Sequence, residues 1–117
     1  MEPGRMNILC ICNQGENRSR TAAEILLHTG KYAVRHDGFF KDRYDDALRK
    51  RVVFNPENLS WAETIIVFEE AHEELLKKYG YRHWGKCRNL HIDDLYDYGN
   101  AGLKRLVREK LREFGFL

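Results

Sequence analysis

Several features that define other classes of protein are missing from this sequence. It has no apolar run near the roughly 20 residues of a membrane-spanning helix, no internal repeat and no low-complexity segment. Only two prolines and nine glycines occur among its 117 residues, which excludes a collagen-like chain and argues against disorder. No apolar stretch typical of a secretory leader follows the first residues. We therefore expect one globular domain, residues 1–117, located in the cytoplasm and without a membrane partner.

The charge and cysteine content exclude two further classes. The 20 basic and 18 acidic residues give a net charge of +2, whereas nucleic-acid-binding domains usually have a marked basic excess. We therefore expect no nucleic-acid partner. Three cysteines, an odd number, argue against a disulfide scaffold and favour a search for a reactive thiol. A site made of Cys10, Cys12, Cys87 and His91 matches no common zinc spacing, so we expect neither a metal nor a cofactor.

Strand-like and helix-like segments alternate along the chain. Short apolar or β-branched runs predict four strands, over residues 6–12, 32–36, 64–68 and 87–92. Apolar residues at helical spacing predict helices from Ser19 to Gly30, near 56–61, and over 71–79 and 103–114. The charged segment 37–51 is interpreted as an exposed connection. This alternation predicts an α/β fold, a single doubly wound domain with a four-stranded parallel sheet flanked by helices on both faces.

The loop after the first predicted strand carries the clearest chemical pattern. It reads Cys12-Asn13-Gln14-Gly15-Glu16-Asn17-Arg18-Ser19. Backbone N–H groups of such a loop, together with a helix N-terminus, can converge on an oxyanion. Arg18 can offer two parallel N–H donors to it. The same field favours the thiolate form of Cys12, and the Ser19 hydroxyl can donate a hydrogen bond to the sulfur. We call this stretch, residues 12–19, the cradle.

Three patches resemble one known family. No nucleotide-binding glycine motif is present, but the cradle resembles the signature loop of the low-molecular-weight protein tyrosine phosphatases. More closely, the run from Arg18 to Ala22 is similar to a short prokaryotic branch of predicted tyrosine phosphatases, in which proline usually stands at the position of Arg20. The segments 61–69 and 92–96 resemble that branch in the same order. The resemblance implies phosphate binding by residues Asn13, Gln14, Gly15, Glu16, Asn17, Arg18 and Ser19.

The third patch supplies candidates for a general acid. Cleavage of a phosphate ester by a thiolate leaves an oxyanion that a carboxylic acid can protonate. In the family this acid is an aspartate followed by proline and an aromatic residue, and Asp94 is the similar position, although Leu95 replaces the proline. Asp97 is the second candidate and Asp93 a third. The resemblance also places Tyr96 at the entrance, where it would stack on an aromatic leaving group.

Several of these residues also have a purely structural interpretation. In that interpretation, Arg18 pairs on the surface with Glu16 or Glu24, and Ser19 is a plain N-cap of the helix. The three aspartates would form a solvated turn. His72, in a strongly acidic segment, is interpreted as a surface residue of a helix.

The pattern as a whole predicts a cysteine-dependent phosphomonoesterase. Cys12, Arg18 and Asp94 are its expected catalytic residues, and a phosphotyrosine protein or a small aryl phosphate is its expected substrate, with inorganic phosphate as product. One alternative is an arsenate reductase on the same scaffold, which needs further thiols; Cys10 and Cys87 lack a paired spacing and are expected to be structural. Another is a catalytically weak phosphate-binding regulatory module.

Overall fold

The computed structural model describes residues 5–14, 16–40 and 54–117, and the predicted connection at 37–51 lies largely outside them. Its strands are β1 (Met6–Cys12), β2 (Tyr32–Gly38), β3 (Thr64–Val67) and β4 (Cys87–Asn89). Its helices are α1 (Arg18–His28), α3 (Glu57–Trp61), α4 (Glu70–Lys78) and α5 (Ala101–Glu113), with a short 3-10 turn at Trp84–Lys86.

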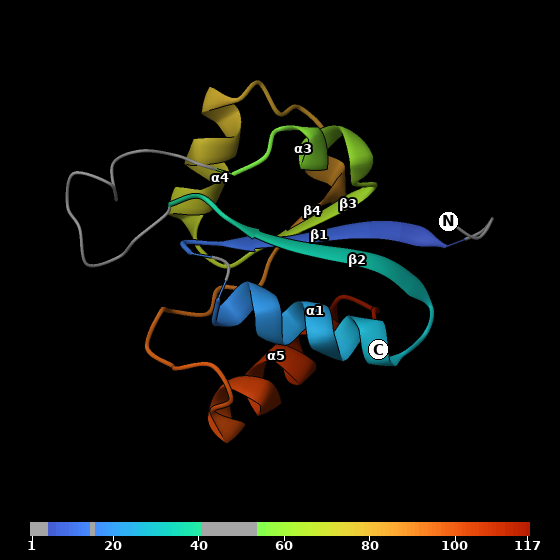
Figure 1. Cartoon of the computed structure of the whole chain (residues 1–117), viewed down its shortest axis with the longest axis vertical. Coiled ribbons are helices and arrows are strands. Elements are labelled where there is room, and N and C mark those ends of the chain that lie inside the picture. Colours follow the sequence, from blue (N-terminus) through green and yellow to red (C-terminus); the bar gives the residue numbers. More distant parts are fainter. Residues whose placement is uncertain (1–4, 15, 41–53) are drawn as a thin grey trace.

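The four strands form one sheet in the order β2-β1-β3-β4, and every neighbouring pair is parallel. Figure 1 shows α1 and α5 on one face of this sheet and α3 and α4 on the other. Parallel neighbours require crossover connections, and the helices of these connections cover both faces. The predicted α/β fold with a doubly wound four-stranded parallel sheet is confirmed.

Strand β1 is buried on both faces because its side chains alternate between two apolar clusters. Ile8, Cys10 and Cys12 belong to the cluster under α1 and α5. Leu9 and Ile11 belong to the cluster under α3 and α4. Successive side chains of a strand point to opposite faces, so the nearly continuous apolar run of residues 6–12 is explained by two cores rather than one.

Several boundaries differ from the sequence prediction. Strand β2 ends at Gly38 rather than at residue 36, so it extends into the segment interpreted as an exposed connection. Strand β4 ends at Asn89 rather than at residue 92. The pairing continues beyond it, because the backbone N–H groups of Leu90 and Ile92 donate to the carbonyl oxygens of Val67 and Phe68 at 2.9 and 3.0 Å. Helix α5 ends at Glu113, so Phe114 lies outside its apolar face and is 43% exposed. Phe116 takes the core position instead.

The order of the strands by itself predicts where a ligand would bind. The chain runs from β1 outward to β2 and then crosses to β3 on the other side of β1, so the winding direction reverses between β1 and β3. In open α/β sheets, ligands bind beyond the carboxyl ends of the two strands at such a reversal. Cys12 ends β1, and Phe68 and Glu69 follow β3.

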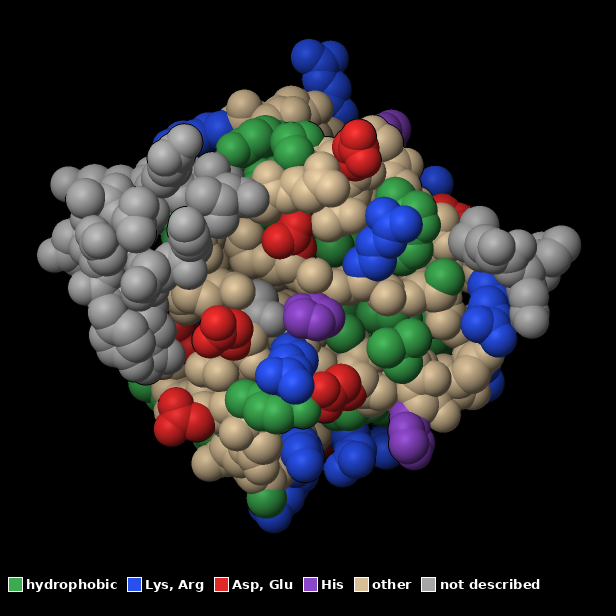
Figure 2. Space-filling model, in the orientation of Figure 1, with side chains coloured by type: hydrophobic (Ala, Val, Ile, Leu, Met, Phe, Trp, Pro, Cys, Tyr) green, Lys and Arg blue, Asp and Glu red, His purple; other side chains and the backbone are tan. Residues whose placement is uncertain are grey.

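Charges of both signs are spread over the face shown in Figure 2, with Lys and Arg gathered at its lower edge, where Figure 1 places α5. A groove of about 430 Å³ lies between α1 and α5 and is lined on the α5 side by Lys104, Arg108 and Arg112. It lies away from the carboxyl ends of the strands. No helix of the described residues is both long enough and apolar enough to cross a membrane.

Candidate active site

The cradle begins where β1 ends, and its cysteine is buried. Cys12 is 3% exposed, and its Sγ lies 3.1 Å from Oγ of Ser19. The Ser19 hydroxyl also lies 3.4 Å from the carbonyl oxygen of Asp37, to which it can donate. The N-cap of α1 is Asn17, without a side-chain capping bond, so the interpretation of Ser19 as a plain N-cap is wrong. Its Oγ accepts from the Cys12 thiol and lies in the first turn of the helix.

Arg18 is buried at the same point, with 1% of its surface exposed. Its Nη1 donates to the carbonyl oxygen of Ile92 at 2.7 Å and forms an ion pair with Oε2 of Glu69 at 2.8 Å. Nη2 lies 3.8 Å from Oδ2 of Asp94. Because Arg18 is buried and pairs with these groups, the interpretation of a surface pair with Glu16 or Glu24 is wrong. A buried guanidinium is tolerated because carboxylates and a carbonyl surround it.

Two donors of Arg18 are left over. Nε and Nη2 are buried and have no hydrogen-bond partner among the described residues. Buried donors are nearly always satisfied in native proteins, and an unsatisfied one calls for an explanation. These two nitrogens form one edge of the planar guanidinium, the edge that binds two oxygens of a phosphate in parallel. The first turn of α1 carries no acidic residue that would compensate the positive end of its dipole.

The other cradle residues occupy different environments. Asn13 and Gln14 are half-buried, Glu16 is exposed, and Gly15 lies outside the described residues. Asn17 is half-buried, and its Oδ1 accepts a hydrogen bond from the backbone N–H of Tyr98 at 3.1 Å.

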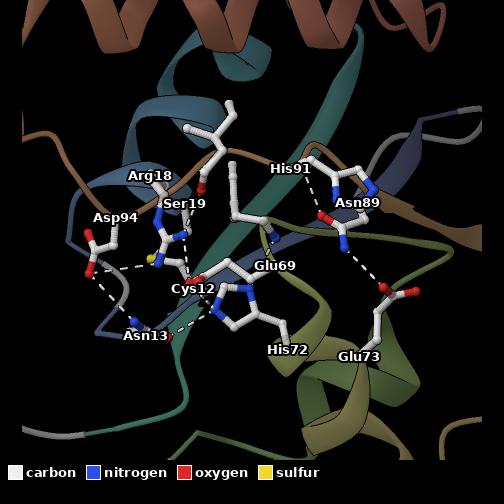
Figure 3. A network of polar contacts seen from close by, with 12 residues as sticks. Cys12, Asn13, Arg18, Ser19, Glu69, His72, Glu73, Asn89, His91 and Asp94 are labelled. Atoms are coloured by element: carbon white, nitrogen blue, oxygen red, sulfur yellow. Dashed lines mark hydrogen bonds and ion pairs between the residues drawn. The ribbon is translucent and has the colours of Figure 1, made fainter.

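The three candidate aspartates lie on the loop between β4 and α5, and one of them reaches the cradle. Oδ2 of Asp94 lies 3.5 Å from Nδ2 of Asn13, besides its contact with Arg18. Asp93 and Asp97 are exposed, and their carbonyl oxygens accept from backbone N–H groups of their own loop. Tyr96 is half-buried against the cluster under α1 and α5. The structure thus brings Asp94 to Arg18 and Asn13, as Figure 3 shows.

Sequence reasoning missed two residues that complete this network. Glu69, directly after the β3 segment, is the ion-pair partner of Arg18. His72 is fully buried, so its interpretation as a surface residue is wrong. Its Nδ1 accepts from the backbone N–H of Phe68 at 3.1 Å, and its Nε2 lies 3.0 Å from Oδ1 of Asn13. The sequence signal for its burial is its spacing of four residues from the apolar Leu76, because this spacing places both residues on one face of α4.

His72 is kept neutral by its surroundings. Burial lowers the pKa of His72 to about 3, and the neighbouring Arg18 charge acts in the same direction. Oε2 of Glu69 lies 3.5 Å from Nε2 and would favour the charged ring, but it is already paired with the guanidinium. Neutral His72 therefore acts as a fixed hydrogen-bonding group at the edge of the cradle.

The remaining cysteines lie in less reactive surroundings. Burial raises the pKa of the Cys10 thiol, and the nearby Cys12 adds to the effect. Burial, with the Glu73 charge as a second cause, raises the pKa of Cys87 to about 12. Neither thiol is ionised near neutral pH. Within the described residues, no three His, Cys, Asp or Glu side chains are arranged to hold a metal ion.

Comparison with known proteins identifies the fold. No family model and no curated protein matches the chain. Among solved structures, it is similar to a low-molecular-weight protein tyrosine phosphatase from T. tengcongensis (17% identity, TM-score 0.62, covering 93% of this chain and 99% of that one). It is also similar to the tyrosine phosphatase Wzb from Escherichia coli K30 in complex with phosphate (17% identity, TM-score 0.67, covering 92% of this chain and 94% of that one). A third similar structure is the YwlE arginine phosphatase from Geobacillus stearothermophilus (18% identity, TM-score 0.61, covering 93% of this chain and 92% of that one). The chain has the fold of the low-molecular-weight protein tyrosine phosphatases.

Proposed function

We propose that this chain is a cysteine-dependent phosphomonoesterase of the cytoplasm that hydrolyses phosphotyrosine through a phosphocysteine at Cys12. One observation carries the proposal. The buried sulfur of Cys12 and the buried guanidinium of Arg18 lie on the same cradle, and two donors of that guanidinium, Nε and Nη2, have no hydrogen-bond partner among the described residues. Two oxygens of a dianionic phosphate can accept hydrogen bonds from these two donors. Binding in this way brings the phosphorus atom next to the sulfur.

The first chemical step forms the phosphocysteine. The Cys12 thiolate attacks phosphorus, a sulfur–phosphorus bond forms, and the bond to the leaving oxygen breaks. Asp94, which lies beside Arg18, gives its proton to that oxygen. Arg18 and the N-terminus of α1 stabilise the charge on the transferred group. The ion pair with Glu69 holds the guanidinium in place while its other edge binds the phosphate.

The second step restores the enzyme. Asp94, now ionised, takes a proton from a water molecule, which attacks phosphorus as the sulfur–phosphorus bond breaks. Sulfur leaves as a thiolate, and the Ser19 hydroxyl 3.1 Å away donates a hydrogen bond to it. Inorganic phosphate is released.

A second substrate class is favoured by the charges beside the cradle. A pocket of about 340 Å³ is lined by Phe68, Glu69, Glu70, Ala71, His91 and Asp93. Of its three carboxylates, that of Glu69 is paired with Arg18, and those of Glu70 and Asp93 suit a leaving group that is a guanidinium rather than a phenol. Phosphoarginine is therefore the second candidate substrate, and one of the similar structures is named as an arginine phosphatase. The two substrates are distinguished by the ratio of their kcat/KM values.

The arsenate reductase alternative finds no support in the described thiols. Resolution of an arseno-cysteine adduct needs a second thiolate that can attack it. The raised pKa values of Cys10 and Cys87 keep both thiols protonated near neutral pH. We therefore do not favour this alternative.

The proposal is tested with an aryl phosphate and the variant Cys12→Ser. We expect turnover in the wild type and none in Cys12→Ser, while Cys87→Ser, a matched change on β4, keeps wild-type turnover. Vanadate should raise the melting temperature of the wild type and of Cys87→Ser. Turnover that survives in Cys12→Ser would refute the covalent mechanism. Protection by vanadate without any turnover in the wild type would identify a binding module instead.

A further inference from the structure

The side chain of Asn13 lies between a fixed histidine and the candidate general acid. Its Oδ1 lies 3.0 Å from Nε2 of His72, and its Nδ2 lies 3.5 Å from Oδ2 of Asp94. Figure 3 shows Asn13 between these two partners, at the start of the cradle. An amide group donates at one end and accepts at the other, so its function depends on which end faces which partner.

The hydrogen bonds of His72 determine this orientation. The backbone N–H of Phe68 can only donate, so Nδ1 of His72, 3.1 Å away, must be the accepting nitrogen. The ring is neutral and buried, and its single proton is therefore on Nε2. An N–H at Nε2 needs an acceptor, which places Oδ1 of Asn13 toward His72. The amide NH2 group of Asn13 then faces the carboxylate of Asp94.

We propose that Asn13 is a positioning residue, whose amide transmits the fixed orientation of His72 to Asp94 and holds that carboxylate at the mouth of the cradle. The inference rests on the proposed function, because it assigns a task to Asn13 only if Asp94 is the proton donor. The chain of contacts runs from the end of β3 through α4 and the end of β1 to the loop after β4, and so joins four segments at one edge of the sheet.

The surroundings of Asp94 explain why such a contact is needed. The loop that carries it is exposed, with Leu95 at 79% exposure. Nη2 of Arg18 is the other polar group of the cradle near its carboxylate, at 3.8 Å. A bound phosphate takes that nitrogen for itself. Asn13 is then the remaining described contact between Asp94 and the cradle. Its Nδ2 donates to Oδ2 of Asp94, so Oδ1 of Asp94 is left to carry the proton that is transferred.

Two variants of Asn13 separate positioning from packing. Asn13→Leu removes both hydrogen bonds at similar volume. Asn13→Asp keeps an acceptor for His72 but places a carboxylate against the carboxylate of Asp94. If Asn13 is needed only for packing or for His72, Asn13→Asp keeps the wild-type dependence of kcat on the leaving group. If Asn13 holds Asp94, this dependence changes. Asn89→Leu is the matched control, because Asn89 is another half-buried asparagine beside α4, with its Nδ2 bonded to Glu73 and not to the cradle.

The readout is the dependence of kcat on the leaving group. Protonation of the leaving oxygen matters for phenyl phosphate and much less for 4-nitrophenyl phosphate. General acid catalysis contributes about 10²–10⁴-fold, so we expect both Asn13 variants to lower kcat with phenyl phosphate about tenfold or more beyond any loss in kcat with 4-nitrophenyl phosphate. Asn89→Leu should keep the wild-type ratio. In an Asp94→Asn background, Asn13→Leu should have no further effect on this ratio, because the two residues act as a unit.

The outcomes distinguish this inference from the proposed function. Equal losses with both substrates, wild-type behaviour of Asn13→Asp, or additive effects with Asp94→Asn would overturn the positioning role while Cys12-dependent turnover remains. A wild type without Cys12-dependent turnover would overturn the proposed function and the positioning role with it. Circular dichroism confirms folding beforehand, and Asn13→Ala replaces any Asn13 variant that does not fold.

Discussion

The buried histidine of the site makes a quantitative prediction about acid stability. His72 is fully buried, accepts from a backbone N–H through Nδ1 and lies near the Arg18 charge. Protonation would place an N–H against the N–H of Phe68 and a charge in a desolvated site. In the unfolded chain the same ring has its ordinary affinity for protons. Acid should therefore unfold the protein partly through this one residue.

The sign and size follow from the two pKa values. The pKa of His72 is about 3 in the folded protein and 6.5 without the fold. Between these values the unfolded state binds one proton more, so the free energy of unfolding falls as the pH falls. This contribution is fully present above pH 6.5 and is lost progressively toward pH 3. At about 1.4 kcal/mol for each pH unit, it amounts to about 2 kcal/mol between neutral pH and pH 5.

Urea unfolding at neutral pH and at pH 5 measures this loss. With a typical slope of about 2 kcal/mol per molar urea, His72 accounts for a decrease of about 1 M in the midpoint. His72→Gln does not titrate in this range, so its midpoint should decrease by about 1 M less than that of the wild type over the same change in pH. His28→Gln, at an exposed position of α1, is the control and should behave like the wild type. Equal decreases in His72→Gln and the wild type would refute the reasoning.

Three further substitutions have defined expected effects. Arg18→Lys replaces the planar two-donor edge by a single ammonium group, so kcat/KM for an aryl phosphate should fall by about 10²-fold or more in steady-state assays. A wild-type kcat/KM in this variant would contradict the role of the guanidinium. Ser19→Ala removes a hydrogen bond to the departing sulfur, worth about 1 kcal/mol, so phosphocysteine hydrolysis should slow by about fivefold to tenfold and the pre-steady-state burst should become more pronounced; an unchanged burst would exclude this role. Asn100→Ala removes the N-cap bond to the backbone N–H of Leu103, which is 3.1 Å long, and should lower the melting temperature in calorimetry by about 4 °C, whereas an unchanged melting temperature would show that the cap contributes nothing.

The fold and the cradle could be predicted because their signals are local. The apolar run 6–12, the polar loop and the helix after it are contiguous, and alternation of such units implies a parallel sheet. Helix ends were less accurate where the chain reverses. Gly115 has a φ of 85°, which turns the backbone after α5 and brings Phe116 rather than Phe114 into the core.

The partners of Arg18 were not predictable in the same way. Glu69, Ile92 and Asp94 come from two segments far along the chain, and only the order of the strands brings them to the guanidinium. His72 was misinterpreted because its acidic neighbours suggested a solvated helix. Its burial is a tertiary effect, since α4 packs against the sheet the face that His72 shares with Leu76, and the spacing of these two residues is a weaker sequence signal than the charges around His72.

The most direct test of Cys12 as the nucleophile is to find the phosphoryl group on it. The wild type and Asp94→Asn are mixed with 4-nitrophenyl phosphate, quenched rapidly and analysed by peptide mass spectrometry. We expect phosphate on the peptide that contains Cys12, accumulating to a higher level in Asp94→Asn because that variant lacks the base for hydrolysis. Release of phosphate while Cys12 stays unmodified at every time point would contradict the mechanism.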